Sequence, residues 1–133
     1  MSTFEDRVAI NDVLARYADA VNQRDADLWG ATWDVDAQWQ LFDPEPVRGR
    51  DAIVAAWREA MAGFPFVVMM VSQGSVEIDG DRATGRSYSS ETATTADGKR
   101  VRVQGCYQDE YRKRDGQWGF SSRVFDVLAS EEY

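Results

Sequence analysis

The chain has 133 residues, 44% of them hydrophobic and 12% aromatic, which suits one domain with one apolar core and argues against global disorder. Its net charge of −8 disfavours a nucleic-acid partner and an anionic membrane surface, because both attract basic patches. Histidine is absent, which excludes Ser-His-Asp, Cys-His and histidine-zinc chemistry and leaves proton transfer to carboxylates, tyrosines, a lysine or a water.

Helical periodicity marks the beginning of the chain. Ser2 and Glu5 have capping-box spacing, and the apolar positions that follow recur at helical intervals up to residue 21. The pattern breaks at residues 22–24. Asp25 is then the expected N-cap of a short second helix that carries Trp29 and Trp33.

A short strand and a third helix follow in the sequence. Alternation around Trp39 and Leu41 predicts the strand, which ends near residues 43–44. The third helix begins after residues 49–51 and is expected to end at Gly63.

Four long strands are predicted from residue 66 onward. Asp-Gly pairs at 79–80, 97–98 and 115–116 favour tight hairpins, because both residues tolerate positive φ. We therefore expect a meander of strands 67–78, 82–94, 100–112 and 117–127. Glycines 85, 105 and 119 inside these strands favour bulges or bends. No linker or second domain is visible, so residues 1–133 are predicted to form a single domain.

The apolar runs and the cysteine content bear on the compartment. The longest apolar run, 64–71, contains Pro65 and is far shorter than the roughly 20 residues of a membrane-spanning helix. Acids lie near the N-terminus where a signal peptide has a positive region. Cys106 is the single cysteine, which rules out an internal disulfide. We expect a cytoplasmic protein with no membrane partner.

These segments, in this order, resemble a known family. The resemblance is carried by residues 14–21 (LARYADAV), 33–39 (WDVDAQW), 48–53 (RGRDAI), 78–83 (IDGDRA), 105–112 (GCYQDEYR) and 115–120 (DGQWGF). The chain looks like the SnoaL-like branch of the nuclear transport factor 2-like superfamily, near scytalone dehydratase and hexachlorocyclohexane dehydrochlorinase. The resemblance implies an α+β, cystatin-like cone, in which a strongly curved antiparallel sheet wraps around N-terminal helices. It also implies a small-molecule pocket, no cofactor and a homodimer.

The catalytic residues of these relatives carry over only in part. Dehydratase-like members pair a histidine with an aspartate, and the matching positions hold Met69 and Asn22, with Asp25 as a possible substitute for the aspartate. In ketosteroid isomerase, a further relative, the oxyanion-binding tyrosine matches Tyr17 and a strand carboxylic acid matches Asp109. The base of neither family is present. The resemblance therefore implies a pair of proton donors without a base.

Tyr17 and Asp109 are the first two catalytic candidates. Tyr17 lies on the apolar face of the first helix, either as a core tyrosine or as a hydrogen-bond donor to a substrate oxygen. Asp109 shares strand parity with Tyr107 and Tyr111, so it is predicted to face inward among aromatic rings, where the pKa of a carboxyl rises and suits a proton donor. The alternative is a structural acid paired with an arginine such as Arg123.

Glu91 is the third catalytic candidate and the best remaining base, because its face of the predicted strand carries small residues that leave room for a ligand. The alternative places this face against solvent or a subunit. Ligand-binding candidates are Asn22, Asp25, Trp39, Met69, Gln73 and Tyr107. Acids at 34, 36, 43 and 45 lack the spacing of a calcium loop, so no metal is expected.

The sequence thus predicts a cofactor-independent isomerase, dehydratase or cyclase that acts on a hydrophobic, oxygenated small molecule in an enclosed pocket. The alternatives are a non-catalytic small-molecule-binding or dimeric partner domain, and an epoxide hydrolase. Tyr17 and Asp109 facing one cavity would favour the enzyme. Asp109 neutralised by an arginine, with no cavity, would favour the binding domain.

Overall fold

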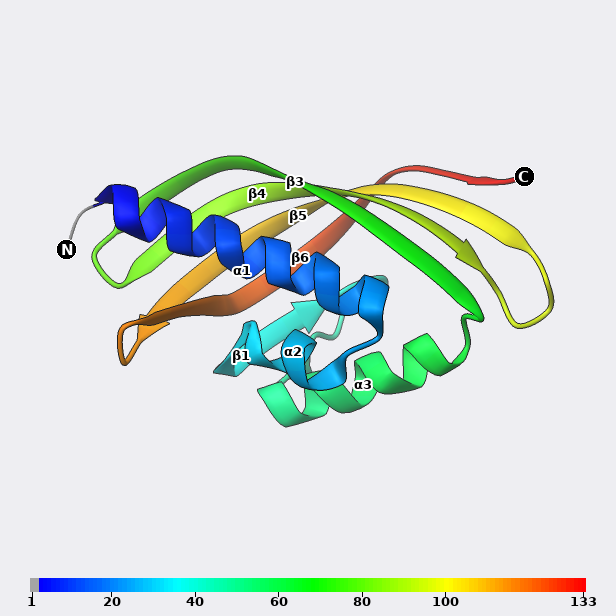
Figure 1. The fold of residues 1–133 in the computed structure, drawn as a ribbon, viewed down its shortest axis with the longest axis horizontal. Helices are drawn as coiled ribbons and strands as arrows, with labels where there is room; N and C mark the ends of the chain where they lie inside the picture. Colours follow the sequence, from blue (N-terminus) through cyan, green and yellow to red (C-terminus); the bar gives the residue numbers. More distant parts are fainter. Residues whose placement is uncertain (1–2) are drawn as a thin grey trace.

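Three helices pack against one curved six-stranded sheet in the computed structural model, which describes residues 3–133 (Figure 1). The helices are α1 (Thr3–Gln23), α2 (Ala26–Ala31) and α3 (Arg50–Ala62). α1 packs against β3 and β6, whereas α2 and α3 pack near β1. Within residues 3–133, no helix is long and apolar enough to cross a membrane. The capping position predicted at Ser2 lies outside the described residues.

The sheet has the strand order β2-β1-β6-β5-β4-β3. Its strands are β1 (Trp33–Gln40), β2 (Val47–Arg48), β3 (Phe66–Asp79), β4 (Arg82–Thr94), β5 (Arg100–Arg114) and β6 (Gln117–Glu132). The four long strands form the predicted antiparallel meander, which confirms the α+β fold class. β1 pairs with β6 in parallel. The alternation of residues in β1 predicts a strand but not the direction in which it pairs.

The hairpin turns and bulges follow the glycines. Gly80, Gly98 and Gly116 have φ of +60°, +87° and +78°, as Asp-Gly hairpins require. At Gly105 the register between β5 and β6 shifts, and a Cβ there would lie 2.1 Å from the Phe125 ring. The missing side chain therefore lets β6 cross close to β5 where the sheet bends.

Helix α2 is shorter than the predicted second helix. Asp25 is its N-cap, as expected, and accepts a hydrogen bond from the Leu28 amide at 3.0 Å. The helix ends at Thr32, whose carbonyl accepts a hydrogen bond from the Phe120 amide at 2.8 Å. This bond draws the chain into the sheet, so Trp33 begins β1 and the prediction that it lies in the helix is wrong.

Both ends of α1 are fixed to the sheet. Near its start, Asp6 accepts hydrogen bonds from Trp118 Nε1 at 2.9 Å and Lys113 Nζ at 3.2 Å. Near its end, the Asn22 side-chain amide donates to the Met69 carbonyl at 2.9 Å and accepts from the Met69 amide at 2.8 Å. β3 is an edge strand, so Asn22 satisfies backbone groups that no neighbouring strand pairs.

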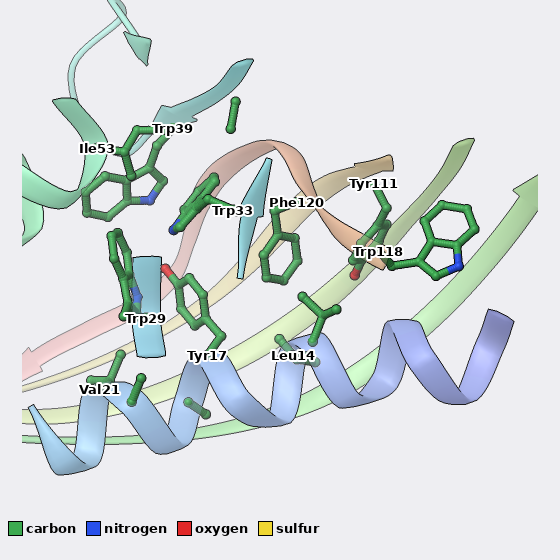
Figure 2. Close-up of a cluster of buried hydrophobic side chains, with 14 of the residues drawn as sticks. Leu14, Tyr17, Val21, Trp29, Trp33, Trp39, Ile53, Tyr111, Trp118 and Phe120 are labelled. Atoms are coloured by element: carbon green, nitrogen blue, oxygen red, sulfur yellow. The ribbon is translucent and has the colours of Figure 1, made fainter. Parts of the chain in front are cut away.

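Aromatic side chains fill the space between α1, α2 and β1. Figure 2 shows Tyr17 rising from α1 between Trp29 and Phe120. Its ring centroid lies 5.4 Å from that of Trp29 and 5.5 Å from that of Phe120. Trp29 in turn stacks on Trp57 of α3 at 4.7 Å. Each such ring contributes roughly 1.5–3 kcal/mol through burial, which holds Tyr17 in one position.

Candidate active site

A cavity of about 330 Å³ lies between the helices and the inner face of the sheet. Its walls are mostly apolar and come from α1, α3, β1 and the segment after it, and β3 to β6. The lining residues are Tyr17, Val21, Trp39, Leu41, Phe42, Trp57, Ala60, Met61, Phe64, Val67, Met69, Glu91, Ala93, Val101, Val103, Tyr107 and Phe125. A mostly apolar hollow with a few polar groups is the usual form of a small-molecule site.

Three ionisable side chains, Tyr17, Tyr107 and Glu91, belong to this lining. Tyr17 comes from α1, Glu91 from β4 and Tyr107 from β5, so three elements bring these groups together. Glu91 is close enough to both tyrosines for its charge to raise their pKa values. The lining therefore combines a carboxyl and two phenols in an apolar surrounding.

The two tyrosines are buried and coupled to each other. Burial raises the pKa of Tyr17 and, more strongly, that of Tyr107, while the positive charge of Arg123 opposes both shifts. The interaction between the two hydroxyls lowers the pKa of Tyr17 and raises that of Tyr107. The two phenols therefore form a coupled pair at the wall of the cavity.

Glu91 is a carboxyl without a hydrogen-bonding partner. It is half-buried on β4, opposite Val103 of β5. Over the described part of the chain, no side chain or backbone group forms a hydrogen bond or ion pair with it. Burial raises its pKa above the ordinary value of 4.5, and Arg123 opposes the rise. A carboxyl in this state exchanges a proton nearer to neutral pH than an exposed one does.

Asp109 faces inward as its strand parity predicts, yet it does not line the cavity. Its Oδ1 accepts a hydrogen bond from Arg123 Nε at 2.7 Å, and its Oδ2 accepts from Ser87 Oγ at 2.8 Å and from Tyr111 at 3.4 Å. This arrangement is the alternative of an acid paired with an arginine. Tyr17 lines the cavity and Asp109 does not, so the two side chains do not face one hollow. The carboxylate of Asp109 is instead bound to Arg123.

Three predicted ligand-binding residues also lie outside the lining. Asn22 is occupied by the backbone of Met69, and Asp25 is an exposed helix cap. Gln73 donates to the Arg86 carbonyl at 3.1 Å. In each case a backbone group uses the polar side chain. The other three candidates, Trp39, Met69 and Tyr107, line the cavity.

Sequence reasoning missed two parts of the site. Leu41 and Phe42, which follow β1, form part of the wall, although neither was a candidate. Arg123 was named only as a partner for Asp109, whereas its guanidinium also lies against the rings of Tyr17 and Tyr107. The extra residue between 120 and 122 brings Arg123 onto the face of Phe120, and strand parity alone contains no signal for this change.

The described residues contain no cluster of three or more acidic or cysteine side chains placed to hold a metal ion. The acids near residues 34–45 are occupied elsewhere. Arg114 Nε donates to Asp34 at 2.9 Å, and Asp43 accepts from the Glu45 amide at 2.9 Å.

Comparison with known proteins identifies relatives along nearly the whole chain. The model of the SnoaL-like domain family matches residues 2–124. Hexachlorocyclohexane dehydrochlorinase (LinA) type 2 is 19% identical, with a TM-score of 0.88 over 98% of this chain and 90% of that one. A candidate scytalone dehydratase from Novosphingobium aromaticivorans is also 19% identical, with a TM-score of 0.88 over 98% and 89%. A single-residue variant of Rv3472 from Mycobacterium tuberculosis, a protein of unknown function, is 30% identical, with a TM-score of 0.82 over 93% and 72%.

Proposed function

The chain belongs to the SnoaL-like domain family, and from this premise we propose that it is an acid–base enzyme, an isomerase or dehydratase, for a hydrophobic, oxygenated small molecule. The observation that carries the proposal is Glu91, a carboxyl in a mostly apolar cavity beside two phenols that forms no hydrogen bond with any of residues 3–133. Two structural neighbours support the reaction class, because their names denote eliminations, a dehydrochlorinase and a dehydratase.

The proposed reaction begins with proton removal. Glu91 takes a proton from the carbon next to a substrate carbonyl, and the C–H electron pair moves onto the carbonyl oxygen to give an enolate. Tyr17 donates a hydrogen bond to this oxygen, while Tyr107 orients the Tyr17 hydroxyl. The protonated Glu91 then returns the proton to another carbon in an isomerisation, or to a departing hydroxyl group, which leaves as water, in a dehydration.

The cavity limits the size of the substrate. A volume of about 330 Å³ lies at the lower end of the range for small-molecule sites. The aromatic lining, including Trp39, Trp57 and Phe125, favours a compact ring compound. One oxygen at the tyrosine end and an apolar remainder would match the distribution of polar groups.

Deuterium exchange tests this proposal without knowledge of the substrate. 2-Tetralone, a compact bicyclic ketone, is incubated with the protein in D₂O, and incorporation next to the carbonyl is followed by NMR. We expect exchange above the buffer rate that falls about 100- to 10,000-fold in Glu91→Gln. Glu59→Gln on the exposed face of α3 makes the same charge change and is expected to keep the wild-type rate. Equal rates for wild type and Glu91→Gln would refute the role of Glu91.

A non-catalytic binding domain is the second candidate. It is favoured by Asn22 and Met69, which stand where related dehydratases have their catalytic pair and instead bond side chain to backbone. In that case 2-tetralone would bind without exchange. Wild-type protein that binds the ketone, but exchanges it no faster than buffer, decides for this candidate.

We also propose a homodimer that forms through the outer face of the sheet. Met70, Tyr88 and Leu128 lie together on this face and are 66%, 42% and 62% exposed. Exposed apolar patches of this kind often mark subunit contacts. Sedimentation of the wild-type chain should give twice the monomer mass, and Met70→Glu should give the monomer mass. A wild-type chain that sediments as a monomer would refute the dimer.

A further inference from the structure

Arg123 is a fully buried cation beside the cavity. It lies on β6, and only 1% of its surface is exposed. Its Nε and Nη2 bind the two carboxylate oxygens of Asp109 at 2.7 and 3.2 Å, and Nη2 also donates to Ser87 Oγ at 2.6 Å. Asp109 and Ser87 therefore hold one edge of the guanidinium in a fixed position.

The rest of the guanidinium lies against aromatic rings. Its central carbon is 3.7 Å from the ring centroid of Tyr107, 4.2 Å from that of Phe120 and 4.5 Å from that of Tyr17. Nη1 has no hydrogen-bond partner among the residues that the structure describes, although it is fully buried. Asp109 thus binds the Nε–Nη2 edge of the guanidinium, and Nη1 lies on the side away from this carboxylate.

We propose that Asp109 and Ser87 position Arg123 so that its charge strengthens Tyr17, which interacts with Tyr107, as a hydrogen-bond donor to an anionic oxygen of the ligand. Asp109 and Arg123 are positioning residues in this account, because neither belongs to the cavity lining. The inference rests on the proposed function for its enolate. It goes beyond that function in assigning a role to the buried ion pair.

The physical reason is the response of a phenol to a nearby cation. Donating a hydrogen bond to an anion shifts negative charge onto the phenol oxygen and ring. A cation against the ring face stabilises this charge, and in a buried site the effect is weakly screened. The charge of Arg123 accordingly opposes the rise in pKa that burial causes at both tyrosines. If the ion pair had only a structural role, its replacement by apolar residues of similar size would leave the binding of an anionic ligand unchanged.

2-Naphthol tests the inference as a stable mimic of the enolate. The background is Glu91→Gln, in which the amide stands for the protonated carboxyl and removes the competing negative charge. Absorbance reports the fraction of naphtholate, so a pH titration gives the apparent pKa of the bound probe. Naphthalene has the same rings without the oxygen and serves as the matched control ligand.

Asp109→Leu with Arg123→Met in this background removes the pair without leaving an isolated buried charge. We expect naphtholate to bind about tenfold more weakly, with a correspondingly higher apparent pKa of the bound naphthol, and naphthalene to bind equally. Arg123→Lys with Asp109 intact should recover part of the difference. Equal naphtholate binding in the presence and absence of the pair overturns the inference, as does a Glu91→Gln protein that does not prefer naphtholate to naphthalene.

If the double variant does not fold, Arg123→Lys in the same background takes its place, because it keeps the positive charge but removes the planar guanidinium that lies against the aromatic rings. Weaker naphtholate binding supports the inference, and unchanged binding overturns it. The outcome is separable from that of the proposed function. Wild-type protein that fails to exchange 2-tetralone refutes the enzyme, whereas the naphtholate comparison still decides the role of the pair.

Discussion

Asp109 and Glu91 are both inward-facing carboxyls on neighbouring strands, but their surroundings differ. Asp109 on β5 is 2% exposed and accepts hydrogen bonds from Arg123, Ser87 and Tyr111. Glu91 on β4 lines the cavity, and nothing described in residues 3–133 forms a hydrogen bond with it. The carboxylate oxygens of Asp109 therefore accept hydrogen bonds within the protein, whereas those of Glu91 accept none from residues 3–133.

This difference indicates which of the two carboxyls is the better candidate for proton transfer. The carboxylate of Asp109 is held by a cation and two hydroxyls and does not line the cavity, so it does not reach a ligand there. A carboxyl in an apolar cavity loses hydration without compensation, which raises its pKa. The residue that contributes least to stability is therefore the better candidate for chemistry, as expected of functional sites.

The largest predicted effect removes the partner of Asp109. Arg123→Met alone should lower the free energy of unfolding by about 3–5 kcal/mol, because it leaves a buried carboxylate unpaired. The Asp109→Leu, Arg123→Met double variant should recover most of this loss. Urea denaturation measures both. Equal stability of the single and double variants would show that Asp109 is not held by its ion pair.

The second prediction concerns the cavity side of the comparison. Tyr17→Phe keeps the ring in the aromatic core but removes the hydroxyl, so the rate of 2-tetralone exchange should fall about 100-fold. Tyr88→Phe on the outer face of β4 is the matched control and should keep the wild-type rate. A Tyr17→Phe protein with full activity would remove the tyrosine from the reaction and leave Glu91 as a base acting alone.

A third prediction tests whether the Asn22 side chain has a structural role and no role in the proposed reaction. Asn22→Ala should cost about 2 kcal/mol of stability, because the Met69 amide and carbonyl on the free side of β3 lose their partner. Chemical denaturation with CD detection measures the loss. At a temperature where the variant is folded, exchange should stay near the wild-type rate. A large loss of activity in folded Asn22→Ala would return this residue to the site.

The smallest predicted effect is a gain of stability in Glu91→Gln. The pKa of Glu91 in the folded protein is raised, so the stability that its protonated form contributes is fully present below about 4.5 and is lost as pH rises through the folded value. Replacement by glutamine should therefore stabilise the protein at pH 7 by roughly 0.5–1 kcal/mol and have little effect at about pH 4. Thermal unfolding at the two pH values measures the difference. A destabilised variant at neutral pH would indicate a hydrogen-bond partner for Glu91.

Much of the fold could be predicted because its signals are local. The Asp-Gly turns, the helical spacing in α1 and the cap at Asp25 each act within a few residues. The end of α2 at Thr32 could not be predicted in this way, because a hydrogen bond from Phe120, far along the chain, determines it. The parallel pairing of β1 with β6 has the same kind of cause.

The sequence predicted which face of the sheet several side chains occupy, but not which residues they contact there. Strand parity placed Tyr107 and Asp109 on the inner face and left the side of Glu91 open, which the structure places in the cavity lining. It left open whether Asp109 pairs with Arg123, because a register shift between residues 110 and 111 sets their position across the β5–β6 ladder. Which inward acid is neutralised depends on register, and register is a property of the assembled sheet.

The pH dependence of 2-tetralone exchange by the wild-type protein tests the role of Glu91 most directly. The rate should rise with pH through one ionisation above 4.5 and then level off, because only the deprotonated carboxyl accepts a proton. The same ionisation should be missing from the residual rate of Glu91→Gln. A rate that does not change between about pH 4 and about pH 8, or an unaltered profile in the variant, would contradict proton transfer by Glu91.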